Sequence, residues 1–333
     1  MRKIKKILFL GNFRVDFTTE SHHLETLKSL GYEVVTFQES EAKGSDILKE
    51  AENADLFIWT HTHGWETEGA EEMLQALKEK NIPTMSYHLD LWLGIERQKD
   101  LDIDPVWKVD YFFTVDKLMA DFLNNTENMP NGFFVPAGVF EEECYIGKEK
   151  TEFLYDVIFV GTKNYHKEWP HRPRLIHFLE QTYGARFAHY GNDGIEKKQI
   201  RGERLNDLYH SAKIVIGDTL CKNFDYPDYF SDRIFETSGR GGFIIHPYIE
   251  GIDKMFELPK LLTLDGHLLD TAKTELITFP FEDFVYLKYV IDYYLKNEEE
   301  REAIRQRGFL RTKAEHTYTE RLQYILNIIE NEQ

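Results

Sequence analysis

The stretch Tyr229-Phe-Ser-Asp-Arg-Ile-Phe-Glu-Thr-Ser-Gly-Arg-Gly-Gly-Phe-Ile-Ile-His246 decides the fold of this chain. Its first part, Ser231 to Ser238, has the pattern of a helix that carries Arg233 and Glu236 three residues apart on one face. The glycines that follow allow a tight turn, and Gly242 to His246 is predicted to be a strand. The spacing alone leaves two interpretations open, a ligand site or an ordinary ion pair followed by a glycine helix end.

The rest of the second half repeats this alternation of strand and helix. The predicted strands are Tyr155 to Gly161, Ala185 to Tyr190, Ile214 to Gly217, Gly242 to His246 and Leu261 to Leu264. The predicted helices are Arg172 to Tyr183, Leu205 to His210, Ser231 to Ser238, Phe281 to Leu295 and Glu299 to Glu330. Such alternation produces a parallel sheet with helices on both faces.

The first half shows the same alternation, and a polar, mostly charged linker at 141–152 separates it from the second. Its predicted strands are Ile7 to Gly11, Glu33 to Phe37, Asp55 to Thr60, Pro83 to Tyr87, Val109 to Val115 and Gly132 to Pro136. We therefore expect an α/β protein of two Rossmann-like domains, 1–145 and 146–310, facing across a cleft. A C-terminal helix at 311–333 would follow, with packing back on the first domain as one option.

Composition narrows the function classes. The formal net charge of −18, with basic residues spread along the chain, disfavours general nucleic-acid binding but allows one local phosphate pocket. No apolar stretch approaches the length of a membrane span, and the short run after the basic start does not fit a signal peptide. Two cysteines, Cys144 and Cys221, cannot form a disulfide framework, so we expect a cytoplasmic protein.

Several ordered motifs of the second half resemble one known family. They are Ser231-Asp-Arg-Ile-Phe-Glu236, Gly241-Gly242-Phe243, Gly251-Ile-Asp-Lys-Met-Phe256, His316-Thr-Tyr-Thr-Glu-Arg-Leu322 and Tyr155-Asp-Val-Ile-Phe-Val-Gly161. They look like the donor domain of CgeB-like, spore-maturation-type glycosyltransferases, GT-B enzymes related to glycosyl transferase group 1. The resemblance covers residues 151–333 well and the first half only in its general pattern.

The resemblance implies roles for two acidic residues of the second half. Glu236 stands where related enzymes hold the ribose hydroxyls of the nucleotide, and a carboxylate can accept hydrogen bonds from both. Asp228, eight positions earlier, stands where a residue that contacts the sugar is expected, although glutamate is the commoner residue there.

Residue chemistry adds further donor-side candidates. Arg233 suits a diphosphate, because a guanidinium matches phosphate oxygens and offsets the charge of a leaving group. Lys163 in the loop after the strand ending at Gly161, and Tyr190 near a nucleobase, are candidates whose alternatives are a plain turn and no specific contact. Arg172 and Arg174 are open to either a phosphate or a surface role. Gly241 and Gly242 allow close backbone approach.

The first half offers weaker motifs at its predicted strand ends. Gly11 and Asn12 resemble the glycine loop that faces the cleft in GT-B acceptor domains, without a full dinucleotide fingerprint. His63 and Asp90 are candidate bases for an inverting transfer, whereas a retaining transfer needs no protein base; a loop residue bonded to backbone is the alternative for each. His61 and His63 lack a clear third ligand, so we predict no metal and no cofactor.

The leading hypothesis is a glycosyltransferase that moves a sugar from a nucleoside diphosphate donor, with a uridine nucleotide expected, to an unidentified acceptor. The acceptor is left open among saccharides, proteins and small molecules. Three alternatives remain: a nucleotide-sugar epimerase, a GT-B protein that binds nucleotide sugars without catalysis, and a phage-type enzyme that glycosylates DNA bases. The acidic charge opposes the last.

Overall fold

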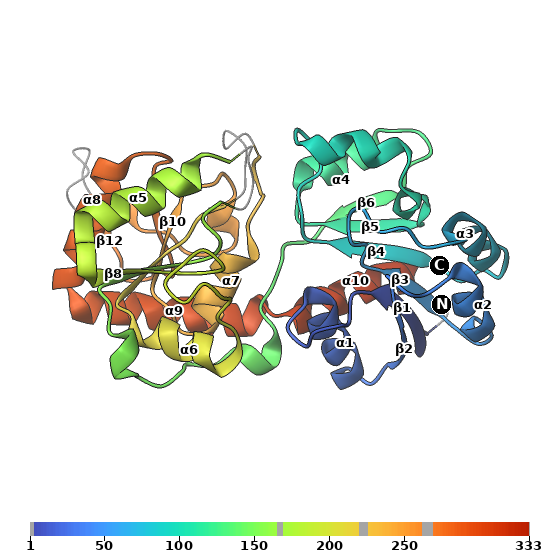
Figure 1. The fold of residues 1–333 in the computed structure, drawn as a ribbon, viewed down its shortest axis with the longest axis horizontal. Helices are drawn as coiled ribbons and strands as arrows, with labels where there is room; N and C mark the ends of the chain where they lie inside the picture. The colour runs from blue at the N-terminus through green and yellow to red at the C-terminus, as the bar shows by residue number, and fades with distance from the viewer. Residues whose placement is uncertain (1–2, 165–168, 220–225, 262–268, 333) are drawn as a thin grey trace. The chain divides into compact units, whose positions relative to one another are not determined.

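The computed structural model describes residues 3–164, 169–219, 226–261 and 269–332, and Figure 1 shows the course of the chain. The chain forms two compact units. The first comprises Met1–Phe140 together with Tyr318–Gln333, and the second comprises Glu141–Thr317. Each unit has its own sheet and its own apolar core, so each is described by itself.

The first unit is built on a parallel sheet whose described strands follow the order β2-β1-β3-β4-β5-β6. Strand β2 follows β1 on one side of it, and β3 then pairs with β1 on the other side, so the sheet has a switch point between β1 and β3. The strands are β1 (Lys6–Gly11), β2 (Glu33–Gln38), β3 (Leu56–Trp59), β4 (Thr84–His88), β5 (Tyr111–Thr114) and β6 (Asn131–Phe134).

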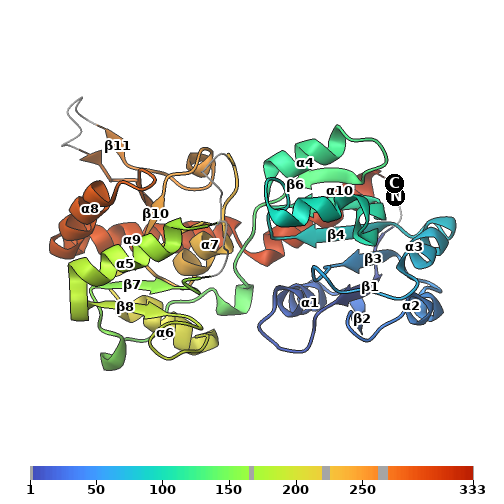
Figure 2. The ribbon, with the colours of Figure 1, turned by 45° about the horizontal axis from the view of Figure 1, so that its top comes forward.

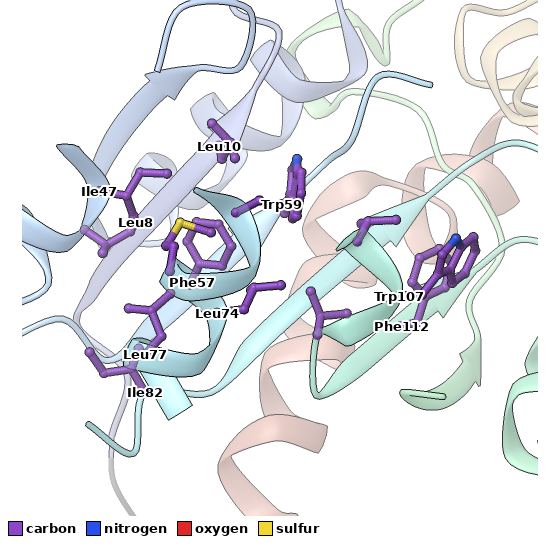
Figure 3. Packing of buried hydrophobic residues seen from close by; sticks show 14 of the residues in the cluster. Leu8, Leu10, Ile47, Phe57, Trp59, Leu74, Leu77, Ile82, Trp107 and Phe112 are labelled. Carbon is purple, nitrogen blue, oxygen red and sulfur yellow. The ribbon is translucent and has the colours of Figure 1, made fainter. Parts of the chain in front are cut away.

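Helices cover both faces of this sheet. They are α1 (Thr19–Ser29), α2 (Gly44–Glu50), α3 (Ala70–Glu79), α4 (Lys117–Asn124) and α10 (Tyr318–Glu332), with the short 3₁₀ helices η1 (Glu96–Asp102) and η2 (Pro105–Lys108). Figure 3 shows how side chains of α2 and α3 pack on the strands, with Phe57, Leu74 and Leu77 at the centre of the cluster. Burying an apolar side chain of this size stabilises a fold by about 1.5–3 kcal/mol.

The C-terminal helix α10 belongs to this first unit and lies beside α1. Its first residue, Tyr318, donates its backbone N–H to Val139 O at 2.9 Å, and Arg321 Nε donates to Pro136 O at 3.0 Å. We expected one long helix from Glu299, but the helix breaks at His316, whose backbone leaves the helical conformation and whose ring Nε2 lies 3.0 Å from Met255 O.

The second unit has a parallel sheet whose described strands follow the order β13-β10-β9-β7-β8. The strands are β7 (Val157–Val160), β8 (Phe187–Tyr190), β9 (Ile214–Ile216), β10 (Ile244–Pro247) and β13 (Ile277–Phe279). A small antiparallel pair, β11 (Lys260–Leu261) and β12 (Leu269–Asp270), lies outside this sheet. The strand predicted at Leu261 to Leu264 thus begins at β11, and its residues 262–264 lie outside the described part of the chain.

Two apolar clusters flank this second sheet. Helix α6 (Gly202–Ser211) packs on one face, and α5 (His171–Tyr183), α8 (Phe284–Lys296) and α9 (Glu298–Glu315) pack on the other, as Figure 2 shows. Helix α7 (Asp232–Gly239) precedes β10. The predicted class, an α/β protein with two parallel, helix-covered sheets, is confirmed.

Two further sequence expectations concern membranes and cysteines. No helix in the described part of the chain combines the length and apolar character that a membrane crossing requires. Cys144 is a buried free thiol, and Cys221 lies outside the described residues.

Candidate functional site

Two glycines at the carboxyl edge of the second sheet bring its loops and Arg233 together. Gly161 follows β7 with φ of 147°, and Gly191 follows β8 with φ of 157°. A Cβ on Gly191 would come within 2.5 Å of Gly161 O, and one on Gly161 would come within 2.8 Å of Arg233 Nη2. Only glycine allows this approach of the two loops and the guanidinium.

Arg233 lies in the first turn of α7 and reaches the end of β7. Its Nε donates to Val160 O at 2.9 Å, its Nη1 donates to Asp218 O at 3.1 Å, and its Cζ lies 5.5 Å from the centre of the Phe159 ring. Both hydrogen bonds go to carbonyl oxygens, so neither of them pairs this guanidinium with a carboxylate. A fixed cation of this kind is suited to an anionic ligand.

Arg172 supplies a second cation over the same ring. It is 3% exposed, its Nε donates to Asp218 Oδ2 at 2.9 Å, and its Nη1 donates to Thr162 O at 3.0 Å. Its Cζ lies 5.7 Å from the centre of the Phe159 ring. Arg174, by contrast, is exposed and pairs with Glu282 on the surface. The structure thus separates two arginines that the sequence left undecided.

Glu236 and the glycine turn lie at the other end of α7. Glu236 Oε1 is 3.8 Å from Nη2 of the buried Arg240, which also pairs with Glu143 and donates to Asn206 Oδ1 at 2.5 Å. Sequence reasoning missed Arg240, although its position four residues after Glu236 on a helix is a signal of contact. The buried guanidinium of Arg240 is therefore an ion-pair partner that helps to fix the position of the Glu236 carboxylate.

The two glycines of the turn serve close packing. Gly241 has φ of 76°, and a Cβ there would come within 2.9 Å of the Ile146 side chain. A Cβ on Gly242 would come within 2.7 Å of the Thr237 side chain. Close packing is thus one reason for these two glycines. Their role in allowing the backbone to approach a donor stays a prediction.

Asp228 is placed with Lys254. The carboxylate oxygens lie 2.8 and 3.2 Å from Lys254 Nζ, and a Cβ on Gly251 would come within 2.0 Å of Oδ1. The residue adopts a positive φ of 60°, a conformation that aspartate adopts more readily than most residues other than glycine. The described contacts bring Asp228 to this loop rather than to Arg233.

Two predicted donor-site residues, Lys163 after β7 and Tyr190 at the end of β8, have contacts within the protein. The backbone N–H groups of Lys163 and Asn164 donate to the Asp193 carboxylate at 2.8 and 3.2 Å. Burial by itself would raise the pKa of Asp193, but these hydrogen bonds outweigh burial and hold that pKa below its usual range. Lys163 Nζ lies 3.6 Å from Glu180. The ring of Tyr190 is buried in the core, which counts against its contact with a nucleobase.

A buried ion-pair cluster lies at the carboxyl edge of the first sheet. Glu39, at the end of β2, accepts hydrogen bonds from Trp59 Nε1 at 2.7 Å and from the backbone of Thr62 at 2.8 Å. His61 lies between Glu39 Oε1 at 2.5 Å and Asp104 Oδ2 at 2.8 Å. Burial opposes protonation, but the two carboxylates raise the pKa of His61 to about 9. His61 is therefore a paired structural cation.

The two predicted base candidates come together around one indole. His63 Nε2 lies 2.8 Å from Asp100 Oδ2, and the His63 ring meets Trp92 edge-on at 5.6 Å. Asp90 Oδ2 accepts from Arg97 Nη1 at 3.2 Å, and Arg97 Cζ lies 5.5 Å from the Trp92 ring. Helix η1 supplies both partners, which the sequence analysis did not identify. His63 is 40% exposed at its side chain, so it remains open to an acceptor.

Gly11 and Asn12 lie beside a carboxyl group that the sequence analysis missed. A Cβ on Gly11 would come within 3.0 Å of Glu20 Cγ, and Asn12 Oδ1 accepts from Gln38 Nε2 at 3.3 Å. Burial raises the pKa of Glu20 to about 7. A possible signal was the N-cap Thr18 followed by an acidic residue in the first turn of α1.

Metal binding has little support in the described ranges. Across these ranges, no group of three or more histidine, cysteine, aspartate or glutamate side chains is arranged to hold a metal ion. The carboxylates around His61 act as its ion-pair partners. The expectation that catalysis needs no metal or cofactor stays a prediction.

Comparison with known proteins adds a family signal for the second unit. Residues 172–327 match a family profile described as Glycosyl transferase-like. No curated protein matches the chain significantly. The matched region includes Arg172, Arg233 and Glu236.

Solved structures are similar over nearly the whole chain. An alpha-glucosyltransferase in complex with UDP-glucose and DNA containing an abasic site is 12% identical, covers 99% of this chain and 100% of its own, and has a TM-score of 0.67. Alr3699/HepE from Anabaena in complex with UDP and glucose is 11% identical, with coverage of 98% and 99% and a TM-score of 0.63. A glycosyltransferase from Rickettsia africae ESF-5 is 12% identical, with coverage of 99% and 99% and a TM-score of 0.59. The chain has the GT-B fold, as predicted. Residues 172–327 carry the sequence profile of a glycosyltransferase, which is the predicted activity.

Proposed function

We propose that the chain transfers a sugar from a uridine diphosphate sugar to an acceptor bound by its first unit. The observation that carries the proposal is Arg233, a fixed guanidinium whose hydrogen bonds go to the carbonyls of Val160 and Asp218. An ordered cation at the carboxyl edge of a parallel sheet is suited to the phosphates of a nucleotide. Similar structures that contain UDP or UDP-glucose support the choice of donor.

The donor roles follow from the placement of side chains. Arg233 would bind the diphosphate and offset the negative charge that develops on it as the sugar leaves. Glu236, restrained by Arg240, would accept hydrogen bonds from the ribose hydroxyls. Asp228 would contact the sugar only if its carboxylate exchanged part of its pairing with Lys254, which makes it the weaker assignment. Gly161 provides the close approach beside Arg233.

We assign the acceptor proton to His63 rather than to Asp90. Asp100 binds His63 Nε2, which leaves Nδ1 as the nitrogen that can accept a proton, the usual arrangement of a base held by a carboxylate. In a direct displacement the acceptor oxygen bonds to the anomeric carbon and its proton passes to Nδ1. The bond from carbon to phosphate oxygen breaks, and its electron pair stays on the diphosphate. In a retaining transfer the leaving phosphate takes this proton instead.

A second candidate function is transfer to a base in DNA. It is favoured by similar structures of an alpha-glucosyltransferase that contain DNA. The net charge of −18 opposes it, because a polyanion needs a basic surface. A DNA complex whose affinity falls steeply with added salt would support this candidate. Turnover of a nucleotide sugar to an isomer without any acceptor would instead indicate an epimerase, and donor binding without turnover would indicate a binding protein.

Calorimetry with UDP and a panel of nucleotide sugars tests the donor site. We expect Arg233→Ala to weaken UDP binding by about 10- to 100-fold, because charged hydrogen bonds contribute about 1.5–3 kcal/mol. Glu236→Ala should weaken binding through loss of the ribose contacts. Arg174→Ala is the matched control, since Arg174 is an exposed arginine of the same unit. If Arg233→Ala and Glu236→Ala bind UDP as tightly as the parent, the site assignment is wrong.

A further inference from the structure

Asp218 is a buried residue that contacts both arginines of the candidate donor site. It follows β9 and is fully buried. Its Oδ2 accepts from Arg172 Nε at 2.9 Å and from Trp169 Nε1 at 3.2 Å. Its backbone oxygen accepts from Arg233 Nη1 at 3.1 Å and from Ser231 Oγ at 3.2 Å. One residue thus restrains Arg172 through its side chain and Arg233 through its main chain.

The two guanidinium groups converge on one short segment of chain. Both lie over the Phe159 ring, with their Cζ atoms 5.7 and 5.5 Å from its centre. Arg172 also donates to Thr162 O, and Arg233 to Val160 O, the residues on either side of Gly161. Gly161 leaves space at this point, so two cations are held close to the same glycine.

The position of Asp218 is itself fixed by close packing. A Cβ on the preceding residue, Gly217, would come within 2.4 Å of His246 Cδ2 on the neighbouring strand β10. A long arginine side chain loses rotamer freedom when it is ordered, and a buried carboxylate is costly unless it is paired. The buried pair between Asp218 and Arg172 meets both requirements and holds the guanidinium in one orientation before a ligand arrives. His171 Nε2 also lies 3.7 Å from Asp218 Oδ1.

We propose that Asp218 is the positioning residue of a two-arginine clamp, formed by Arg172 and Arg233, that takes the diphosphate of the donor. The proposal rests on the proposed function, because it concerns the same ligand. The described hydrogen bonds of Arg233 go to backbone oxygens, and Arg172 pairs with the Asp218 carboxylate. Guanidinium groups suit the oxygens of a diphosphate, whose negative charge would lie against both. Arg172 becomes a second phosphate contact, and Asp218 acts through it without touching the ligand.

The test compares UDP with uridine, which lacks the phosphates, by calorimetry on the full chain. Asp218→Asn keeps the size of the side chain and the backbone oxygen but removes the charge that orients Arg172. We expect it to weaken UDP binding by about 10- to 100-fold and to leave uridine binding within about twofold. Trp169→Phe is the control: it removes the other donor to the same oxygen, keeps both arginines, and should change UDP binding little.

A double variant and a second substitution complete the test. Arg172→Gln with Asp218→Asn should bind UDP no more weakly than Arg172→Gln alone, because Asp218 acts through Arg172. If Asp218→Asn does not fold, Arg172→Lys keeps the charge but cannot reach both Asp218 Oδ2 and Thr162 O, and it should still weaken UDP selectively. Equal losses for UDP and uridine, or no loss, would overturn the clamp. Absence of UDP binding by the parent would instead contradict the proposed function.

Discussion

The carboxyl edges of the two sheets have the same architecture and opposite electrostatics. In the second unit, Arg233 donates to the backbone carbonyl oxygens of Val160 and Asp218, and the buried Asp218 carboxylate pairs with Arg172. In the first unit, His61 is matched by two carboxylates and His63 by one. One edge presents two guanidinium groups suited to an anion, whereas the other presents imidazole rings held by carboxylates, which suit a hydroxyl group and its proton. The fold alone therefore does not set the chemistry of an edge.

The largest expected effect concerns the matched charges of the first unit. His61→Ala should destabilise the unit by about 3–5 kcal/mol, because it leaves the carboxylates of Glu39 and Asp104 without their shared cation. Unfolding in urea measures this loss. Lys117→Ala is the control in the same unit, since its ion pair with Asp121 is exposed and should contribute less than about 1 kcal/mol.

The same cluster predicts a pH dependence. The pKa of His61 is raised from 6.5 to about 9, so the stability that protonation adds is fully present below pH 6.5 and is lost as the pH rises through 9. The parent should lose about 3 kcal/mol of unfolding free energy over this window through this residue. His61→Ala should lack that slope. An identical slope in both proteins would contradict a charged His61.

The next effect concerns His63, the proposed base at the edge of the first sheet. His63→Ala should lower kcat by at least about 100-fold while UDP binding stays unchanged, because a general base contributes about 10²–10⁴ in rate. Asp90→Asn is the control: Asp90 is paired with Arg97, so its loss should lower kcat less than about tenfold. Steady-state rates and calorimetry on both variants measure the difference. A His63→Ala enzyme that keeps nearly full kcat would place the proton on the leaving phosphate, as in a retaining transfer.

Sequence periodicity predicted the fold well because each strand and helix signals itself locally. Strands β7, β8, β9 and β10 of the second sheet and the turn at Gly241 and Gly242 were predicted from apolar runs and glycines. Strand β13 was not predicted, and the strand predicted at Leu261 to Leu264 begins at β11, outside this sheet. The break of the last helix at His316 could not be predicted, since it depends on a contact with Met255 across 61 residues of chain. Long-range contacts of this kind have no local pattern.

The candidate site was predicted only in part, for the same reason. Arg233 follows from its place in a helix before a glycine turn, and the structure puts it at the end of β7. Asp218 and Asp100 were missed because each acts on a side chain that another element supplies. Arg240 was missed although it lies four residues after Glu236, a spacing that indicates contact along a helix. Tyr190 was predicted correctly as the last residue of a strand, but the inward or outward direction of its ring depends on strand register.

The smallest expected effect tests Glu20, a carboxyl group of the first unit whose pKa burial raises. Burial raises its pKa from 4.5 to about 7, so the folded state holds a proton that the unfolded chain releases, and stability falls as the pH rises from 4.5 through 7. Glu20→Gln removes this penalty and should stabilise the first unit by about 1 kcal/mol at pH 8, after allowance for the partial exposure of the side chain, with little change at pH 5. Glu72→Gln, an exposed first-turn glutamate of α3, should show no such difference between the two pH values. Unfolding in urea at both pH values measures it. If Glu20→Gln stabilises equally at both pH values, Glu20 is not a neutral acid at the edge beside Gly11.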